Sequence, residues 1–150
     1  GKTVYGVEST IIKYENGNIY LLRPGALSPE KIEKEFGKKL LLPVAGKIES
    51  PGQFKKHYSP DKKLIIVNNE NDIKNSKDAG YISFKNMPLK SYKFSAVLSE
   101  NGDLYEAASN LFDVLHRAEE TDIKKIYVER VPLKGIGFAM MDRLKRAEGL

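Results

Sequence analysis

Apolar and polar residues alternate in two short runs near the start of the chain. The runs, residues 9–14 and 19–23, flank the sequence Glu-Asn-Gly-Asn at residues 15–18. An Asn-Gly pair between two alternating runs is typical of a tight β-hairpin turn. We therefore predict a β-hairpin over residues 9–23.

A short helix is predicted after the hairpin, over residues 29–36. Ser28 suits the N-cap position, Pro29 the first helical position, and Gly37 the left-handed conformation that ends many helices. A hairpin and one short helix cannot enclose a hydrophobic core of their own. We expect this first third of the chain to pack against further structure.

Residues 44–62 lose the regular pattern and gain glycine and proline, which indicates an ordered linker. The segment also carries four residues that can contact a ligand, and these are Lys55, Lys56, His57 and Tyr58.

Short apolar runs return after Lys63. They predict strands at residues 64–67, 80–84, 94–98 and 125–129. The polar stretch 71–77 lies between the first two runs, and we interpret the whole as strands that alternate with helices.

Two longer helices are predicted in the same region. Asp103 and Glu106 have the spacing of a capping box, and apolar residues repeat at helical spacing from there to Ala118. Ile136 and Met140 begin the apolar face of a closing helix. Residues 63–150 are therefore predicted to form a small, open α/β sheet.

The composition narrows the class of protein. The chain has 150 residues, 41% of them hydrophobic, and holds no apolar run long enough to span a membrane. With no signal-peptide pattern at its start, we expect a cytoplasmic location. The chain has 0 cysteines, so disulfides, thiolate zinc sites and cysteine nucleophiles are excluded.

The net charge of +5 is concentrated in the first part of the chain. Residues 1–62 hold 11 Lys and Arg against 7 Asp and Glu, whereas residues 63–150 hold 14 against 13. Such an excess suits an anionic small ligand or RNA, but it also fits an ordinary solvated surface.

Three segments resemble the threonylcarbamoyl-AMP synthases in sequence, order and spacing. They are Glu-Ser-Thr-Ile-Ile at residues 8–12, Leu-Arg-Pro-Gly-Ala at 22–26, and Ser-Pro-Gly followed by His-Tyr-Ser-Pro over 50–60. The ending, residues 135–147, is similar to the last helix of the long form of this family. The resemblance implies that residues 1–43 are the C-terminal piece of a YrdC-like α/β catalytic domain, 44–62 an interdomain linker, and 63–150 a Rossmann-like accessory domain.

The resemblance also implies an activity. Enzymes of this family join L-threonine, bicarbonate and ATP into threonylcarbamoyl-AMP and pyrophosphate, usually with Mg²⁺, for the threonylcarbamoyladenosine modification of tRNA. Ser9 then corresponds to a threonine contact and Arg23 to an ATP contact, since a guanidinium fork suits phosphate oxygens. A strand-edge serine and a surface arginine are the alternatives.

The hairpin offers a geometric test of these two roles. A two-residue loop pairs Thr10 with Arg23 and puts Ser9 on the opposite face, whereas a three-residue loop pairs Ile11 with Arg23. We predict the second register, or a bulge with the same effect.

By the same resemblance, Tyr58 and His57 are assigned to ATP, with the linker as a lid that excludes water. A packing role is the alternative for both. Catalytic residues and metal ligands are not identified in this chain. Asp142 and Arg143 are expected on a solvated helix face, and Gly135-Ile136-Gly137 is interpreted as a helix-packing feature.

The chain departs from the family in one respect. The Lys-x-Arg pair of the catalytic domain does not occur in it, because the chain begins one strand before residues 9–12. We expect these residues to be inactive alone and to need the N-terminal half of the catalytic domain. The alternative is a noncatalytic module that binds RNA or partner proteins of the tRNA-modification pathway.

Overall fold

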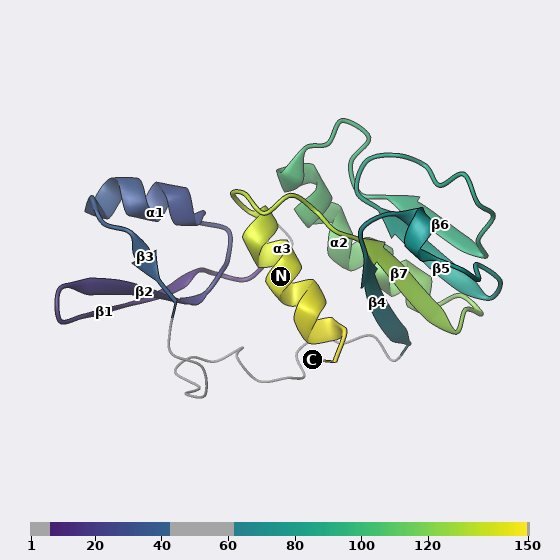
Figure 1. The fold of residues 1–150 in the computed structure, drawn as a ribbon, viewed down its shortest axis with the longest axis horizontal. Helices are drawn as coiled ribbons and strands as arrows, with labels where there is room; N and C mark the ends of the chain where they lie inside the picture. Colours follow the sequence, from purple (N-terminus) through teal and green to yellow (C-terminus); the bar gives the residue numbers. More distant parts are fainter. Residues whose placement is uncertain (1–6, 43–61, 150) are drawn as a thin grey trace.

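The computed structural model describes residues 7–42 and 62–149. Four elements belong to the first range, and they are β1 (Ile11–Glu15), β2 (Asn18–Arg23), α1 (Pro29–Phe36) and β3 (Leu40–Leu41). The three strands form one sheet in the order β1-β2-β3, with β1 antiparallel and β3 parallel to β2. Figure 1 shows α1 lying over this sheet.

The hairpin has the two-residue loop that its Asn-Gly pair favours. Asn16 and Gly17 have φ values of 51° and 77°, and Glu15 pairs with Asn18. Positive φ at both loop residues matches the twist of the flanking strands.

A β-bulge then shifts the pairing of the two strands by one residue at the open end of the hairpin. Ile12 pairs with Leu21, but Ile11 pairs with Arg23, so Leu22 is the extra residue. Of the two predicted alternatives, the three-residue loop is wrong and the bulge that places Ile11 opposite Arg23 is confirmed.

The ends of α1 follow the sequence signals. The Ser28 hydroxyl accepts a hydrogen bond from the Lys31 N–H at 3.3 Å, and Gly37 has φ 63°. The short strand β3 was not predicted. Its Leu40 N–H donates to the Glu33 carboxylate at 2.9 Å, which ties the strand to the helix before it.

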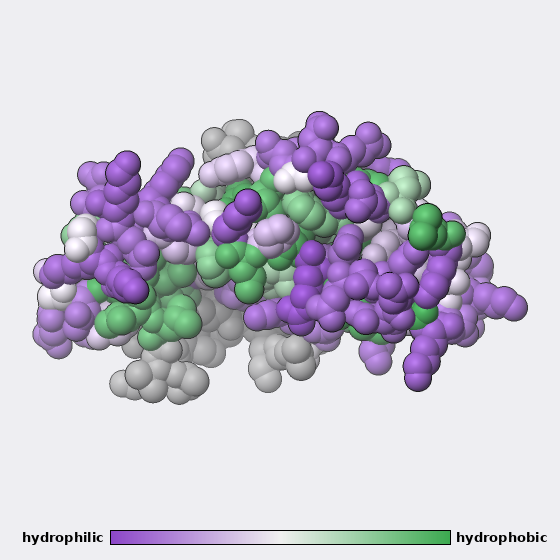
Figure 2. Space-filling view, turned by 45° about the horizontal axis from the view of Figure 1, so that its top comes forward, coloured by the Kyte–Doolittle hydropathy of each residue, from purple (hydrophilic) through white to green (hydrophobic). Residues whose placement is uncertain are grey.

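The first sheet buries few large side chains among the described residues. Ile19 and Ile32 are 1% and 2% exposed, whereas Tyr14 and Leu42 are 66% and 78% exposed. Figure 2 shows apolar surface at the end of the molecule that holds β1–β3 in Figure 1. This exposure agrees with the expectation that the first third packs against further structure.

The second range forms a four-stranded parallel sheet. Its strands are β4 (Lys63–Val67), β5 (Ala79–Ser83), β6 (Phe94–Val97) and β7 (Lys125–Glu129), in the order β4-β7-β5-β6. All three pairings are parallel. The predicted α/β class and open sheet are confirmed.

The helix expected between the first two strands is wrong. Residues 68–78 contain only the short 3₁₀ helix η1 (Glu70–Asp72). Side chains compete there for backbone N–H groups, since Asn69 accepts from the Asn71 N–H and Asp72 from the Asn68 N–H, at 2.9 and 2.8 Å. Such local bonds favour turns over an α-helix.

Two helices were placed correctly. They are α2 (Leu104–Glu119), between β6 and β7, and α3 (Gly137–Ala147), after β7. Asp103 caps α2 by accepting from the Tyr105 and Glu106 N–H groups. Ser99 completes the predicted capping box, because its hydroxyl accepts from the Asp103 N–H and donates to the Glu106 carboxylate.

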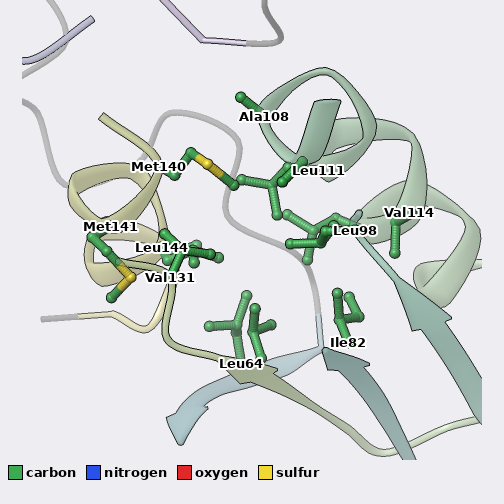
Figure 3. Close-up of a cluster of buried hydrophobic side chains, with 14 of the residues drawn as sticks. Leu64, Ile82, Leu98, Ala108, Leu111, Val114, Val131, Met140, Met141 and Leu144 are labelled. Carbon is green, nitrogen blue, oxygen red and sulfur yellow. The ribbon is translucent and has the colours of Figure 1, made fainter. Parts of the chain in front are cut away.

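Side chains alternate between the two faces of this sheet, as the period of a strand requires. On one face the strands meet α2 and α3 in the main core, shown in Figure 3. Leu64 and Ile82 from the strands, Leu111 from α2, and Met140 and Leu144 from α3 are each 2% exposed or less. Burying each such side chain contributes about 1.5–3 kcal/mol.

The other face of the sheet is covered by loops. Tyr81 of β5 stacks on Tyr92 with ring centroids 5.0 Å apart, and Ile73 and Tyr127 pack in the same layer. Burial raises the pKa of Tyr81, and the nearby Glu129 carboxylate raises it further. The Tyr81 phenol therefore stays neutral.

Helix α3 joins the two sheets. Val7 is 5% exposed and belongs to the same core as α3, with Ala26 packed against it. The Gly135 N–H, just before α3, donates to the Glu30 carboxylate of α1 at 3.2 Å. Burial raises the pKa of Glu30, but this bond and those from its own N–H and from Ser28 outweigh burial and lower it.

The carboxylate of Glu148, at the end of α3, accepts a hydrogen bond from the Ile66 N–H of β4 at 2.7 Å. In the described ranges, no helix is long and apolar enough to cross a membrane.

Asp78 provides a pH test of the second domain. It has φ 57°, and its carboxylate lies 2.8 Å from Lys93. The hydrogen bond and charge of Lys93 lower the Asp78 pKa, so the ionised group stabilises the fold above the ordinary Asp pKa, and this contribution is lost as pH falls through the lowered pKa.

We expect Asp78→Asn to lower the melting temperature at neutral pH, because asparagine tolerates the same backbone conformation but lacks the charge. The difference from the unmutated chain should shrink as pH falls below about 3.9, the ordinary value for Asp, and vanish only once pH is below the lowered pKa of the folded state. Thermal unfolding followed by circular dichroism across pH 2–7 measures this. A difference that is the same at every pH would show that the ion pair contributes nothing.

Candidate functional site

The bulged end of the hairpin brings together residues 8–10 and 23–25. A Cβ on Gly25 would lie 2.2 Å from the Thr10 nitrogen and 2.3 Å from the Glu8 carbonyl oxygen. No side chain fits between two backbones at that distance, so glycine is required here. The Ala26 N–H then donates to the Glu8 carbonyl at 3.1 Å.

Thr10 also stabilises this close approach of the two backbone segments, through two hydrogen bonds with Leu27. Its hydroxyl donates to the Leu27 carbonyl at 2.8 Å and accepts from the Leu27 N–H at 3.0 Å. This hydroxyl is used within the fold. The neighbouring Ser9 is exposed.

Arg23 is held by Ser9 itself and by the residue before it, Glu8. Its Nε donates to the Ser9 carbonyl oxygen at 3.1 Å, and its Nη1 lies 2.7 Å from the Glu8 carboxylate. Its side chain is only 14% exposed. The structure therefore brings Ser9 and Arg23 together, as the predicted register requires, and the Ser9 backbone carbonyl accepts the hydrogen bond from Arg23.

A pocket lies between this segment and α3. The hairpin side contributes Val7, Glu8, Arg23 and Pro24, and α3 contributes Ala139, Asp142, Arg143 and Arg146. Asp142 and Arg146 form an ion pair of 2.5 Å, at the (i, i+4) spacing of helix neighbours. Arg143 lies over the ring of Phe112 at 5.3 Å.

The pocket is strongly charged. Three guanidinium groups face two carboxylates, which leaves an excess of one positive charge. Burial raises the pKa of Asp142, Arg146 opposes this, and the nearby Glu8 carboxylate adds to it. The arrangement can hold an anion with several oxygens, because planar guanidinium forks match such groups.

Sequence reasoning missed part of this pocket. Asp142 and Arg143, expected on a solvated face, are half-buried and line it. Glu8 was quoted only within a motif, and Arg146 was not singled out. The (i, i+4) pairing of Asp142 with Arg146 was a readable signal, but the position of α3 against the hairpin was not.

Other candidate residues have simpler outcomes. A Cβ on Gly137 would lie 2.0 Å from the Pro132 carbonyl oxygen, which agrees with a packing role for this glycine. His116 is exposed on α2 and stacks on Phe112. His57 and Tyr58 lie outside the described residues.

Comparisons with known proteins place the chain in a family. The family described as threonylcarbamoyl-AMP synthase, C-terminal domain, matches residues 27–149. The threonylcarbamoyl-AMP synthase of Pyrococcus abyssi is 36% identical over 162 residues, and that of Bacillus subtilis is 30% identical over 163. Each match covers 99% of this chain, and 48% and 47% of the relative.

Solved structures agree in fold. A crystal structure of P. abyssi Sua5 complexed with L-threonine matches with a TM-score of 0.81 and 31% identity, over 99% of this chain and 48% of that chain. A variant of the same protein, with a neighbouring histidine and tyrosine replaced by alanine, matches with a TM-score of 0.76 and 30% identity, over 99% and 47%. The chain spans about half the length of the relatives it matches. It belongs to the threonylcarbamoyl-AMP synthase C-terminal domain family.

Proposed function

We propose that the full-length protein is an L-threonylcarbamoyladenylate synthase. It forms threonylcarbamoyl-AMP and pyrophosphate from L-threonine, bicarbonate and ATP, for the threonylcarbamoyladenosine modification of tRNA. The observation that carries the proposal is the bulged hairpin, which sets Ser9 beside a restrained Arg23. The names of the two relatives support it, as does the L-threonine in the P. abyssi crystal structure.

The proposed roles follow from the chemistry of the product. Threonylcarbamoyl-AMP is a mixed anhydride, so a carbamate oxygen must bond to the α-phosphorus of ATP while the bond to pyrophosphate breaks. Ser9, with an exposed hydroxyl, would hydrogen-bond the threonine substrate. Arg23 would contact ATP phosphate oxygens.

Arg23 is suited to this task because it is restrained beforehand. The Ser9 carbonyl and the Glu8 carboxylate fix the plane of its guanidinium group. A group that is already oriented loses little conformational entropy when the ligand binds, and its charge needs no reorganisation as charge develops on the phosphates.

Mg²⁺ fits the described residues only as a companion of the nucleotide. The two carboxylates of the pocket, Glu8 and Asp142, are each paired with an arginine. In the described ranges, no three or more His, Asp or Glu side chains gather as a metal site. Magnesium in nucleotide sites is held largely by phosphates and water, so it would neutralise charge there without a ligand cage from this half of the protein.

We further propose that residues 1–43 complete a catalytic domain whose other half precedes them. The exposed apolar side chains of the first sheet, including Tyr14 and Leu42, support this. Tyr81 and Tyr127 are buried in the loop-covered layer and cannot stack on bases, so they give no support to an RNA-binding role for residues 63–150; Tyr105 and Phe112 are 40% and 47% exposed.

The first test compares the chain with the full-length protein. Calorimetry with L-threonine, and with ATP in the presence of Mg²⁺ and bicarbonate, measures binding, and released pyrophosphate measures turnover. We expect binding of both substrates and turnover by the full-length protein alone. Turnover by the short chain would show that the half proposed to be missing is not needed, and no turnover by either would overturn the proposed activity.

The second test distinguishes the roles of the adjacent Ser9 and Thr10 hydroxyls in the full-length protein. Ser9→Ala should raise the KM for L-threonine by about tenfold, the effect of losing a hydrogen bond to a charged group, and leave the melting temperature unchanged. Thr10→Val is the matched control, because its hydroxyl bonds Leu27. We expect it to lower the melting temperature. An unchanged KM in Ser9→Ala would remove the threonine contact.

The third test concerns the linker. We propose that Tyr58, with His57 beside it, contacts ATP when the linker covers the site. The P. abyssi variant with a neighbouring histidine and tyrosine replaced shows that such a pair has been altered in a relative, and this chain has one His-Tyr pair. Tyr58→Ala in the full-length protein should weaken ATP binding about tenfold by removing a stacking contact. Unchanged ATP affinity and activity would exclude the contact.

A further inference from the structure

Besides the apolar side that packs in the core, helix α3 has a charged side that core packing does not explain. Met140, Met141 and Leu144 face the sheet and are 1% exposed or less. Asp142, Arg143 and Arg146 instead line the pocket that also holds Arg23.

The spacing of these residues makes the pocket a feature of the helix. Asp142 and Arg143 lie three and four residues after Ala139, and Arg146 lies four and three residues after them, so the four share one side of α3. Ala139 is small and 4% exposed, which lets the helix approach the hairpin segment while the longer side chains around it reach the pocket.

Both arginines of α3 are restrained. Arg146 is paired with Asp142 at 2.5 Å, and its side chain is 20% exposed. Arg143 lies over the ring of Phe112 at 5.3 Å, and this cation–π contact helps to orient its guanidinium plane. On the hairpin side of the pocket, the Glu8 carboxylate restrains Arg23, as the Asp142 carboxylate restrains Arg146. The pocket thus presents three oriented guanidinium groups with a positive excess.

We propose that Arg143 and Arg146 join Arg23 in one binding site for the phosphate chain of ATP and for the pyrophosphate released from it. The site is shared by the hairpin and α3, so the parallel-sheet domain takes part in substrate binding through α3. The proposal rests on the proposed function for its ligand. A diphosphate or triphosphate group matches the chemistry of this lining best, because several guanidinium forks can each bind a pair of its oxygens.

The ion pairs with Glu8 and Asp142 determine how the site responds to its ligand. Each carboxylate keeps an arginine in place, and each also competes with phosphate for it. Removing a carboxylate should therefore strengthen anion binding, whereas removing an arginine should weaken it. A purely structural ion pair predicts the same loss of stability from either partner and no effect on the ligand.

The experiment uses the full-length protein and calorimetry with three probes, which are inorganic pyrophosphate, ATP and AMP. We expect Arg143→Gln and Arg146→Gln each to weaken pyrophosphate and ATP binding by about tenfold, the value of one lost charged hydrogen bond. AMP binding should change much less, because AMP lacks the β- and γ-phosphates.

Arg117→Gln is the matched control. Arg117 is also an arginine stacked on an aromatic ring, Phe94 at 5.9 Å, but it lies on α2 and is not among the residues that line the pocket. We expect it to leave all three affinities unchanged. An equal loss in Arg117→Gln and Arg143→Gln would reduce the effect to overall charge and overturn the site.

Asp142→Asn decides between a ligand site and a structural pair. We expect pyrophosphate to bind about threefold more tightly, because a nearby negative charge is removed. Weaker binding would overturn the proposal, as would unchanged pyrophosphate affinity in the double variant Arg143→Gln, Arg146→Gln. Should the arginine variants fail to fold, Asp142→Asn still gives a decision.

The same measurements separate this site from the proposed activity. Failure of the unmutated protein to bind L-threonine or to release pyrophosphate from ATP would count against the synthase alone. Pyrophosphate binding that depends on Arg143 and Arg146 would still stand in that case. If the protein is an active synthase and neither arginine affects its affinity for pyrophosphate or ATP, the proposed activity stands and the shared site is excluded.

Discussion

Helix α3 is buried on two sides, and the rest of the described structure depends on this. One side places Met140 and Leu144 in the core under the parallel sheet, while the other meets Val7 and the charged hairpin segment. In Figure 1, α3 accordingly lies between the two sheets. Loss of the helix would uncover the part of the second sheet that α2 does not cover and remove one wall of the pocket, so the stability of this sheet and the shape of the pocket are linked.

The hairpin end shows how a precise site is built from weak local parts. Gly25 lets two backbone segments touch, and the Thr10 hydroxyl fastens them at Leu27. Arg23 is then held through a backbone carbonyl and a carboxylate. Because a half-buried charge without its partner is costly, Arg23 and Glu8 keep one another in place, and the resulting geometry is available before any ligand arrives.

Much of the fold could be predicted because its signals are local. Asn16-Gly17 specifies its turn through positive φ values, and Ser28 and Asp103 satisfy backbone N–H groups at helix starts. The helix prediction for residues 71–77 was wrong because a polar stretch fits a helix and a loop equally well, and in this loop the side chains hydrogen-bond to the backbone. The strand β3 is two residues long and exists only through pairing with β2.

The candidate site was predictable only in part for the same reason. Ser9 and Arg23 belong to short segments whose pairing is decided within one hairpin. Asp142, Arg143 and Arg146 line the pocket because α3, more than 100 positions further along the chain, packs beside Arg23. The helical repeat of α3 does not show which segment lies opposite. The helical repeat of apolar residues along α3 predicted its core face. It did not predict which segment packs against the second face.

The contact between Glu148 and Ile66 bears on how the molecule avoids self-association. Among the described residues, strand β4 has β7 on one side only, and a strand edge offers N–H groups to which another chain can add a strand. The carboxylate from the end of α3 already accepts from one of these groups. An incoming strand would have to displace a negative charge, so the helix that completes the core also blocks growth of the sheet from this edge.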